Sequence, residues 1–515
     1  MAMTDDSGVD VMKMRVSDVR DSNFLSLLSP TLQLLPIALR ALDPLHLHQP
    51  SNLKHLISPY NWSSGYKFTV TAISCISTIF ASFAASCYSP GAEQMANEWD
   101  VSQEVVIVGV TTFTCGFAVG PMFLAPFSEI NGRKPVYVGT AILFTVCQLY
   151  CAVCRSFTGM LVARFWAGIG GSTFSTMVGG IVADIYPAQK RNTPMACFSS
   201  AALFGTGLGP LVCGFIAEYT TWRWIFCIQI IVGGMISCAV ILFFRETRVT
   251  VVLRKKAKLL NQLMEKLEAA GVYSVQVSAE IDREDGPSEK TMRIRWKIGA
   301  EEKQANFATM IQTSLLRPFQ LLFTEPVSVL YIKLSVIPLI FEKTYGFSLS
   351  DSNTIFAASC TGTLLMTTIS ILQEQLATRQ KGWNSVPEHR LYFSCVESIC
   401  LPIGLFIFGW TPHYHVHWIV PAIGVCISTA GIFSVYLSVF NYLTDTYHQY
   451  ASSALAAQSF CRNMLGGVFP LVSRQLFSNL TYRPAGSLLG GIGATLTLVP
   501  WVLVFMGRRF VRIAS

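Results

Sequence analysis

The chain has 515 residues, of which 51% are hydrophobic and only 13% are charged, and its mean hydropathy is +0.46. Soluble proteins carry roughly 25% charged residues, so the composition excludes an ordinary soluble enzyme or binding domain. The net charge of +8 would suggest nucleic acid in a soluble protein. Here, basic residues on the cytosolic side of membrane helices explain it, and we expect no nucleic-acid partner. All fifteen cysteines lie in apolar segments, which argues against a disulfide framework.

The first 67 residues predict a cytosolic N-terminal tail, 1–67, without a cleavable signal peptide. Their one apolar stretch, Phe24–Leu42, is interrupted by Pro30 and Pro36. It also lacks the basic flank and the small-residue cleavage site of a secretory signal.

An N-terminal bundle, 68–244, is predicted from six apolar segments, each close to the roughly 20 residues that cross a hydrocarbon core. The segments are Phe68–Tyr88, Val105–Leu124, Val136–Val153, Met160–Ile181, Met195–Ala217 and Trp224–Phe244. A charged cytosolic linker, 245–326, follows. Within it, Arg254–Ala270 has apolar residues at helical spacing, which predicts an amphipathic helix that lies on the inner leaflet or serves as a solvated tether.

A C-terminal bundle, 327–506, and a short cytosolic tail, 507–515, complete the chain. The predicted spans are Val327–Ile340, Thr354–Leu372, Leu391–Phe408, Trp418–Leu443, Ser453–Val472 and Leu488–Met506. Basic residues concentrate in the segments that are inner when both termini are cytosolic, which fixes this orientation.

The seventh span is short, since its 14 residues would reach only about 21 Å. Three interpretations remain open. The helix borrows Phe341–Tyr345 and Lys333 extends to the interface; the gene record lacks about a dozen residues, which we slightly favour; or the protein is an impaired relative.

The turn after the second span contains Glu129, Gly132, Arg133 and Lys134. A tight turn between two long helices predicts a positive φ angle at Gly132. A positive-inside turn explains the basic pair, but an acid at Glu129 is costly near lipid unless a cation or a helix N-terminus is close.

Two further spans contain unusual residues. Arg164 lies in the fourth span, where an arginine either faces a cavity or partner or extends to the outer interface. The fifth span contains Gly205, Gly209, Pro210 and Gly214. Glycines at this spacing permit close helix packing, and the proline permits a bend.

Together these motifs resemble those of the major facilitator superfamily. Three further stretches look like its fungal drug:proton antiporter branch with twelve helices: Pro59–Ser63 before the first span, Arg245–Arg248 after the sixth, and Pro387–Leu391 at the start of the ninth. The turn motif resembles a signature whose acid holds the two halves together on the inner side; Ala125 stands where the family usually has glycine. Arg164 and Gly168 fit an Arg-x-x-x-Gly signature linked to proton coupling. The fifth-span motif is similar to one found in antiporters.

The resemblance implies an all-α membrane protein, with twelve transmembrane helices in two six-helix bundles, a shortened seventh helix and alternating access. It implies proton-coupled efflux of a small organic molecule, such as a drug, toxin, secondary metabolite or polyamine, by a monomer in the plasma membrane. Uptake, uncoupled diffusion or impaired transport are the alternatives. We expect no cofactor, no metal and no enzymatic activity, because no nucleophile–base pair or phosphate-binding loop is evident.

Three more charged residues are candidates. Glu397 in the ninth span is interpreted either as a proton carrier or as a structural contact, and the structural contact is the favoured interpretation. Asp445 and Arg462 lie in stretches that also look like family positions, and we expect either to pair with a charge across the inner gate.

Overall fold

The computed structural model describes residues 58–187, 190–269, 328–379, 391–414, 416–447, 451–480, 482–498 and 500–501, with short strands within 3–15 and 276–297. It divides into two units, one comprising Ser64–Arg245 and Phe307–Ser515, the other Met1–Ser63 and Glu246–Asn306.

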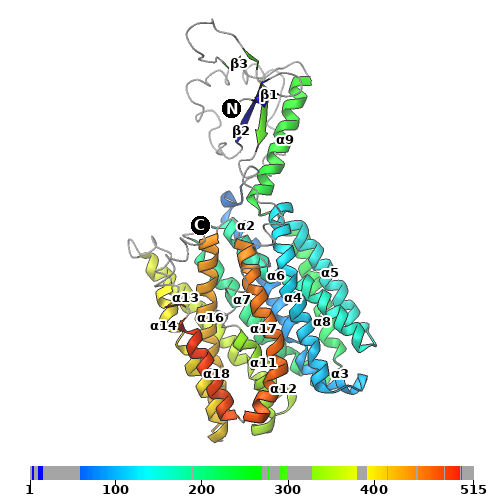
Figure 1. The fold of residues 1–515 in the computed structure, drawn as a ribbon, viewed down its shortest axis with the longest axis vertical. Coiled ribbons are helices and arrows are strands. Elements are labelled where there is room, and N and C mark those ends of the chain that lie inside the picture. Colours follow the sequence, from blue (N-terminus) through cyan, green and yellow to red (C-terminus); the bar gives the residue numbers. More distant parts are fainter. Residues whose placement is uncertain are drawn as a thin grey trace. The chain divides into compact units, whose positions relative to one another are not determined.

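The first unit, called the membrane unit below, is a bundle of long helices (Figure 1). Its first half contains α2 (Ser64–Ser86), α3 (Ala92–Trp99), α4 (Gln103–Asn131), α5 (Arg133–Val153), α6 (Phe157–Ile185), α7 (Asn192–Tyr219) and α8 (Arg223–Phe243). Its second half contains α11 (Ser328–Tyr345), α12 (Leu349–Thr354), α13 (Phe356–Arg379), α14 (Leu391–Glu397), α15 (Cys400–Trp410), α16 (Ile419–Tyr447), α17 (Ala451–Leu480) and α18 (Tyr482–Leu496).

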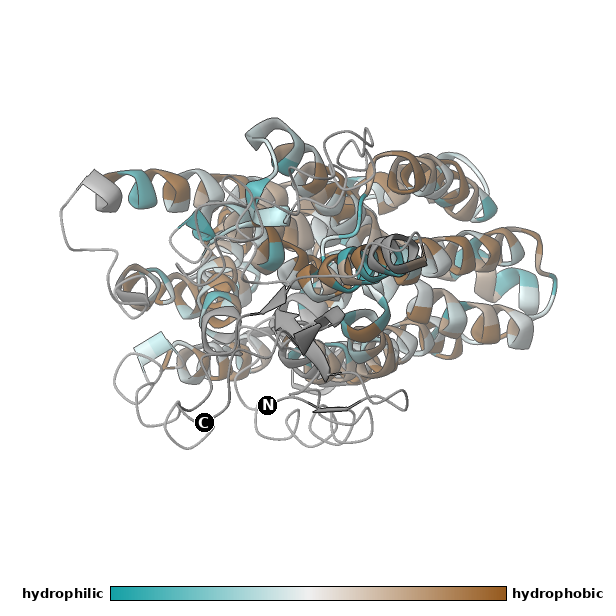
Figure 2. Cartoon of the chain, turned by 90° about the horizontal axis from the view of Figure 1, so that it is seen from above, coloured by the Kyte–Doolittle hydropathy of each residue, from teal (hydrophilic) through white to brown (hydrophobic). Residues whose placement is uncertain are grey.

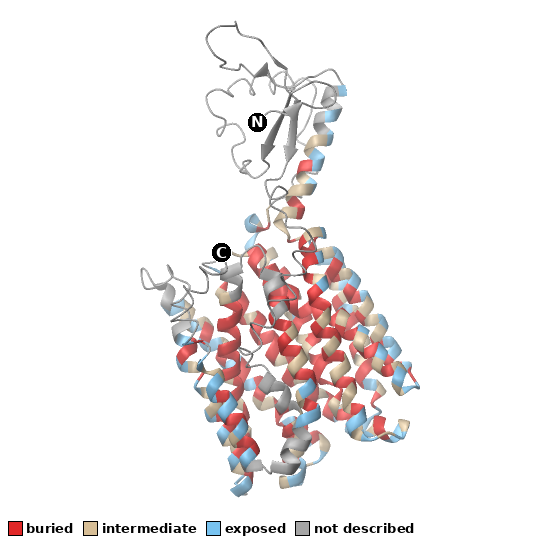
Figure 3. Ribbon diagram, viewed as in Figure 1, coloured by how far each residue is buried: buried red, intermediate tan, exposed pale blue. Residues whose placement is uncertain are grey.

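A helix covers at least part of each of the twelve predicted spans, which confirms the all-α membrane fold. Among the described residues, eight helices are long and apolar enough to cross a membrane by length and composition alone. Hydrophobic residues run along the helices of the bundle (Figure 2). Buried residues gather where the helices face one another, and exposed residues lie on the outer faces (Figure 3). This distribution suits a protein whose outer surface meets lipid.

The seventh helix, α11, has 18 residues and therefore a length of about 27 Å. It includes Phe341–Tyr345, as the first of the three interpretations predicted. The same interpretation is wrong about Lys333, whose side chain is buried inside the bundle rather than extended to the interface.

The ninth span is interrupted, whereas the sequence predicted one helix. Helix α14 ends at Glu397 and α15 begins at Cys400. Pro402 lacks the N–H that would bond to the Ser398 carbonyl four residues earlier, and its ring crowds the same carbonyl. The chain instead forms a tighter turn in which the Leu401 N–H donates to the Ser398 oxygen at 3.0 Å.

The second unit contains the predicted amphipathic helix, observed as α9 (Val249–Ala269). It also contains strands β1 (Met3–Thr4), β2 (Asp10–Arg15), β3 (Gln276–Val277), β4 (Lys290–Thr291) and β5 (Arg293–Lys297). Strands β1, β2 and β5 form one sheet, in which β2 pairs with β5 in parallel, with Val11 opposite Arg293. The sequence analysis missed this sheet and treated its strands as parts of two separate segments.

Glycines allow helices α4 and α6 to approach closely inside the first half. A Cβ at Gly168 on α6 would lie 2.1 Å from the Phe113 carbonyl oxygen on α4, and one at Gly116 on α4 would lie 2.0 Å from the Phe165 oxygen. Gly168 of the Arg-x-x-x-Gly signature is thus a packing residue.

We expect Gly168→Ala to lower the free energy of unfolding by about 1–3 kcal/mol, because backbone must move to admit the methyl group. The matched control is Gly234→Ala on α8, where a Cβ would meet nothing within 4 Å. Thermal unfolding of the purified protein in detergent measures both. Equal midpoints for the two variants would contradict the packing role of Gly168.

Candidate functional site

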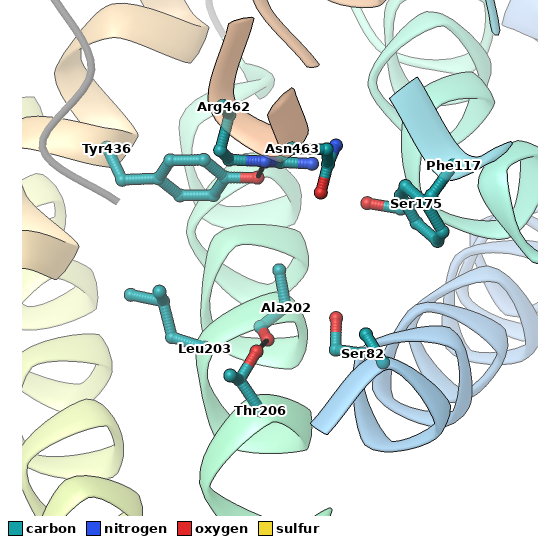
Figure 4. Close-up of a pocket in the computed structure, with 10 residues that line it drawn as sticks. Ser82, Phe117, Ser175, Ala202, Leu203, Thr206, Tyr436, Arg462 and Asn463 are labelled. Carbon is teal, nitrogen blue, oxygen red and sulfur yellow. Dashed lines mark hydrogen bonds between the residues drawn. The ribbon is translucent and has the colours of Figure 1, made fainter. Parts of the chain in front are cut away.

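A central cavity lies between the two halves of the membrane unit (Figure 4). Helices α2, α4, α6 and α7 supply one side, and α16 and α17 supply the other. The lining residues are Ser82, Ala85, Phe117, Ser175, Ala202, Leu203, Thr206, Tyr436, Arg462 and Asn463. The cavity volume is about 20 Å³, room for about one water molecule. This is far below the ~300–1,000 Å³ typical of small-molecule sites, so the halves must move apart before the cavity can enclose a small molecule.

Arg462 lies on this cavity, not at the inner gate where the sequence analysis expected it. It is eleven residues from the start of the thirty-residue helix α17, which places it about 16 Å along the helix axis. Its guanidinium donates hydrogen bonds to the Tyr436 hydroxyl on α16 at 2.5 Å and to the Ser459 hydroxyl at 3.2 Å. These bonds hold the side chain against the cavity wall, and Figure 4 shows Arg462 beside Tyr436.

The rest of the lining combines small polar groups with apolar surface. Ser82, Ser175, Thr206 and Asn463 offer hydroxyl or amide groups, and Phe117 is the aromatic side chain opposite Tyr436. Among the lining residues that the structure describes, none is acidic. A site of this kind can orient a polar group while it covers an apolar body.

The turn after α4 has the conformation that the sequence predicted. Gly132 has a φ angle of +105°, which glycine adopts without a Cβ penalty. The turn directs Arg133 into the bundle, where its Nε donates to the Asp184 carboxylate on α6 at 2.6 Å. Lys134 Nζ donates to the Ile241 carbonyl at the end of α8 at 3.3 Å.

Glu129 lies in the last turn of α4 and is 4% exposed, so it is enclosed by protein. The sequence analysis missed Asp184, the partner of Arg133. Asp184 lies just beyond the predicted fourth span, 51 residues after Arg133, and only its position near the inner end of a helix could have suggested it.

The two halves touch on the side of the cavity nearer the turn between α4 and α5. The Asn441 amide on α16 donates to the Asn192 amide oxygen on α7 at 2.7 Å. The Thr193 hydroxyl on α7 donates to the Glu374 carboxylate on α13. Asp445 lies within α16, but its side chain is outside the described part of the chain.

The halves also touch on the opposite side of the cavity. The Thr111 hydroxyl on α4 donates to the Gly467 carbonyl on α17 at 2.9 Å. The Glu218 carboxylate on α7 accepts a hydrogen bond from the Ser350 N–H on α12. Contacts between the halves therefore lie on both sides of the cavity.

Arg164 is completely buried and does not extend to the interface. Its guanidinium carbon lies 4.6 Å from the centre of the Tyr88 ring and 4.5 Å from that of Phe113, both distances typical of cation–π contacts. It donates to the carbonyls of Gly109 and Ala84 at 3.3 and 3.4 Å. Arg164 is not among the residues that line the cavity.

Glu397 ends helix α14 and is likewise absent from the cavity lining. Its carboxylate accepts hydrogen bonds from the Gln373 amide on α13 and the Ser434 hydroxyl on α16, both at 2.6 Å. These contacts join three helices of the second half beside the break in the ninth span. This geometry favours the structural alternative for Glu397.

The fifth-helix motif lies on α7 and faces two neighbours. A Cβ at Gly205 would lie 2.3 Å from the Ile79 carbonyl oxygen, and one at Gly209 would lie 2.1 Å from the Ser86 hydroxyl, both on α2. A Cβ at Gly214 would lie 2.6 Å from Asn353 in the other half. Pro210 is buried within the helix.

Comparison with known proteins places this arrangement in a family context. The sequence profile described as Major Facilitator Superfamily matches residues 74–471. The chain is 32% identical over 476 residues to the MFS-type transporter paaT of Penicillium rubens, covering 89% of this chain and 82% of the relative. It is 32% identical over 467 residues to the MFS-type efflux pump MFS2 of Trichophyton rubrum, covering 88% and 74%.

A solved structure of the xylose transporter XylE from E. coli, described as partially occluded and inward open, has a similar fold. The TM-score is 0.57 at 15% sequence identity, and the match covers 85% of this chain and 99% of that chain.

The buried Arg133–Asp184 pair should contribute strongly to stability at the inner turn. The Arg133 side chain is 1% exposed and that of Asp184 is 11% exposed. Arg133→Met or Asp184→Leu alone should cost about 3–5 kcal/mol, because each leaves a buried charge without its partner. The double variant should cost clearly less than the sum of the two. Additive losses in the free energy of unfolding would show that the pair is not coupled.

Proposed function

Since the chain belongs to the Major Facilitator Superfamily, we propose that it exports a small organic molecule in exchange for protons. Membership makes the chain a multi-pass membrane transporter of a small molecule. The proposal adds the direction and the coupling ion. Export is supported by the relative named as an efflux pump, and by the fifth-helix motif, which resembles that of antiporters.

The observation that carries the proposal is the cavity between the halves, with contacts between them on both sides. Alternating access requires a site at mid-depth that opens to one side when one set of contacts separates. On the inner side, the Asn192–Asn441 and Thr193–Glu374 contacts would separate to admit substrate. On the outer side, the Thr111–Gly467 and Glu218–Ser350 contacts would separate to release it.

We assign the inner turn a role in this cycle. Glu129, Gly132, Arg133 and Lys134 form the inner gate, with Asp184 holding Arg133 in place. Asp445 is proposed to belong to the same gate from the second half. Gly205 and Gly209 of α7 provide the close packing against α2 on which this half moves as one body, whereas Gly214 meets Asn353 of the other half.

Arg164 couples protons to substrate through its fixed positive charge, because an arginine does not lose its proton in proteins. Its place between Tyr88 and Phe113 lets it act on α2, α4 and α6 together. Glu397 remains a second candidate for coupling, although its hydrogen bonds fit a structural contact better.

The proposal also includes the setting. The protein acts as a monomer in the plasma membrane, with tail 1–67, linker 245–326 and tail 507–515 in the cytosol and the bundles 68–244 and 327–506 in the bilayer. Proton entry down its gradient then drives substrate out of the cell.

Liposomes that contain the purified protein and have an acidic lumen should accumulate a transported probe from the outer medium. Molecules inserted with their cytosolic side outward then export the probe into the lumen as protons leave it. Suitable probes are ethidium as an organic cation, spermidine as a polyamine and benzoate as an organic acid. A protonophore should collapse the accumulation. Flux that ignores the pH gradient would favour an uncoupled facilitator, and flux no faster than that of empty liposomes would refute transport of these probes.

Arg164→Met should reduce gradient-driven flux by at least about tenfold while exchange of labelled for unlabelled probe continues. Methionine fills much of the buried volume between the two rings, so the packing loss is smaller than with alanine. Arg155→Met, at an exposed arginine before the same helix, is the matched control and should leave the flux unchanged. Unchanged gradient-driven flux in Arg164→Met would remove Arg164 from the coupling mechanism.

A further inference from the structure

Lys333 is a buried cation that the proposed mechanism does not use. It lies on α11, and only 1% of it is exposed. Placing an ammonium group among membrane helices has a large desolvation cost, so such residues usually mark an ion or proton pathway.

The partners of Lys333 are neutral hydroxyl groups. Its Nζ donates to the Ser428 hydroxyl oxygen and, at 3.3 Å, to that of Thr429, both on α16. Both hydroxyls donate hydrogen bonds to backbone carbonyls, Ser428 to Gly424 and Thr429 to Val425, each at 2.8 Å. Their lone pairs therefore face the amine. Among the described residues, no carboxylate lies within ion-pair distance of Nζ.

A chain of hydroxyl groups leads from this amine toward the cavity wall. Thr429 is 3.3 Å from the Ser359 hydroxyl on α13. Ser359 in turn lies beside Gly207 on α7, where a Cβ in place of the glycine hydrogen would be 3.4 Å from the Ser359 Cβ. The residue before Gly207, Thr206, lines the cavity. The hydroxyl chain ends at Ser359, which packs against the backbone of α7, the helix that forms one wall of the cavity.

Lys333 differs from the other buried charged residues in the described part of the membrane unit. Arg133, Arg164, Arg191 and Arg462 are guanidinium groups, which keep their protons. Two acids, Glu129 and Asp184, lie near the inner turn, where Asp184 binds Arg133. Lysine can release its proton in a buried site.

Other titratable groups on the helices around Lys333 bind elsewhere: the Glu374 carboxylate on α13 accepts from Thr193, and the Glu397 carboxylate on α14 accepts from Gln373 and Ser434. On α16 the Cys426 thiol interacts with it electrostatically. On α13 the Cys360 thiol is directed to the Phe204 carbonyl, and on α17 the Arg462 guanidinium is directed to Tyr436. On α11 and α12 themselves, Glu342, Lys343 and Asp351 are exposed.

We propose that Lys333 is the proton-carrying group of the transport cycle. Its Nζ accepts a proton that enters from the outside through the cavity and the Ser359–Thr429 hydroxyls, and it returns that proton to cytosolic water when the site faces inward. This inference rests on the proposed proton-coupled export. It adds the residue that alternates between a charged and a neutral form.

The test compares Lys333→Arg and Lys333→Met with the wild-type chain in liposomes, with ethidium as the probe. Arginine keeps a permanent charge and methionine has none, so neither can alternate. We expect the gradient-driven flux of both variants to be lower than that of the wild-type chain by at least about tenfold. Exchange of labelled for unlabelled ethidium without a gradient should stay within about twofold of wild type, because it needs no proton cycle.

The matched control is Lys343→Met, on the same helix but exposed at its outer end, which should leave both fluxes unchanged. Coupled flux in either Lys333 variant would overturn the proposal. Loss of exchange in a folded variant would also overturn it, because Lys333 would then be needed for transport itself. If arginine does not fit the buried site, methionine decides alone. Wild-type ethidium flux that ignores the pH gradient would instead refute proton coupling, and this inference with it.

Discussion

Hydrocarbon offers no hydrogen-bond partner to a polar group, so each charged side chain inside the bundle must be held by other parts of the chain. The described buried charges follow this constraint in different ways. Arg133 binds a carboxylate, Arg164 lies between two aromatic rings and two carbonyls, and Arg462 binds a phenol and a serine hydroxyl. Each arrangement offsets the cost of burying the charge. It also fixes the separation and rotation of the helices that supply the partners, and so positions the cavity.

The helices pack differently within a half and between halves. Inside the first half, backbone approaches backbone at Gly116, Gly168 and Gly205, where even a methyl group would clash. Such contacts resist sliding, because any shift brings main-chain atoms together. Between the halves, glycines also pack closely, but against side chains such as Thr114 and Asn353 rather than against backbone. The polar contacts there are single hydrogen bonds, such as Thr111–Gly467 and Asn192–Asn441. A bundle built this way can separate at the seam while each half keeps its internal packing.

Much of the fold could be predicted from the sequence, because apolar length and local turn chemistry are written in neighbouring residues. The twelve spans and the positive φ angle at Gly132 belong to this class. The break after Glu397 was missed, although Pro402 was visible, because other helices such as α4 and α7 contain buried prolines without breaking. The parallel pairing of β2 with β5 joins segments almost 280 residues apart, and no local pattern indicates such a pair.

The site was less predictable than the fold for a related reason. The sequence identified Arg462 as a charged residue inside a span but could not show that it faces the cavity. It gave no reason to single out Asp184, which becomes notable only because it binds Arg133. Side-chain partners depend on how helices rotate about their axes, which hydropathy alone does not specify.

Fixed and titratable cations have different uses around such a cavity. Arg462 provides a charge that no accessible pH removes. It can therefore orient a substrate, but it cannot bind a proton on one side of the membrane and release it on the other. An amine that gains and loses a proton can do so, since the two forms differ by a full charge in a region of low dielectric constant. With Lys333 behind the α7–α13 seam and Arg462 on the wall, orientation and coupling fall to different residues. Substrate specificity could then change through the lining residues without loss of the proton cycle.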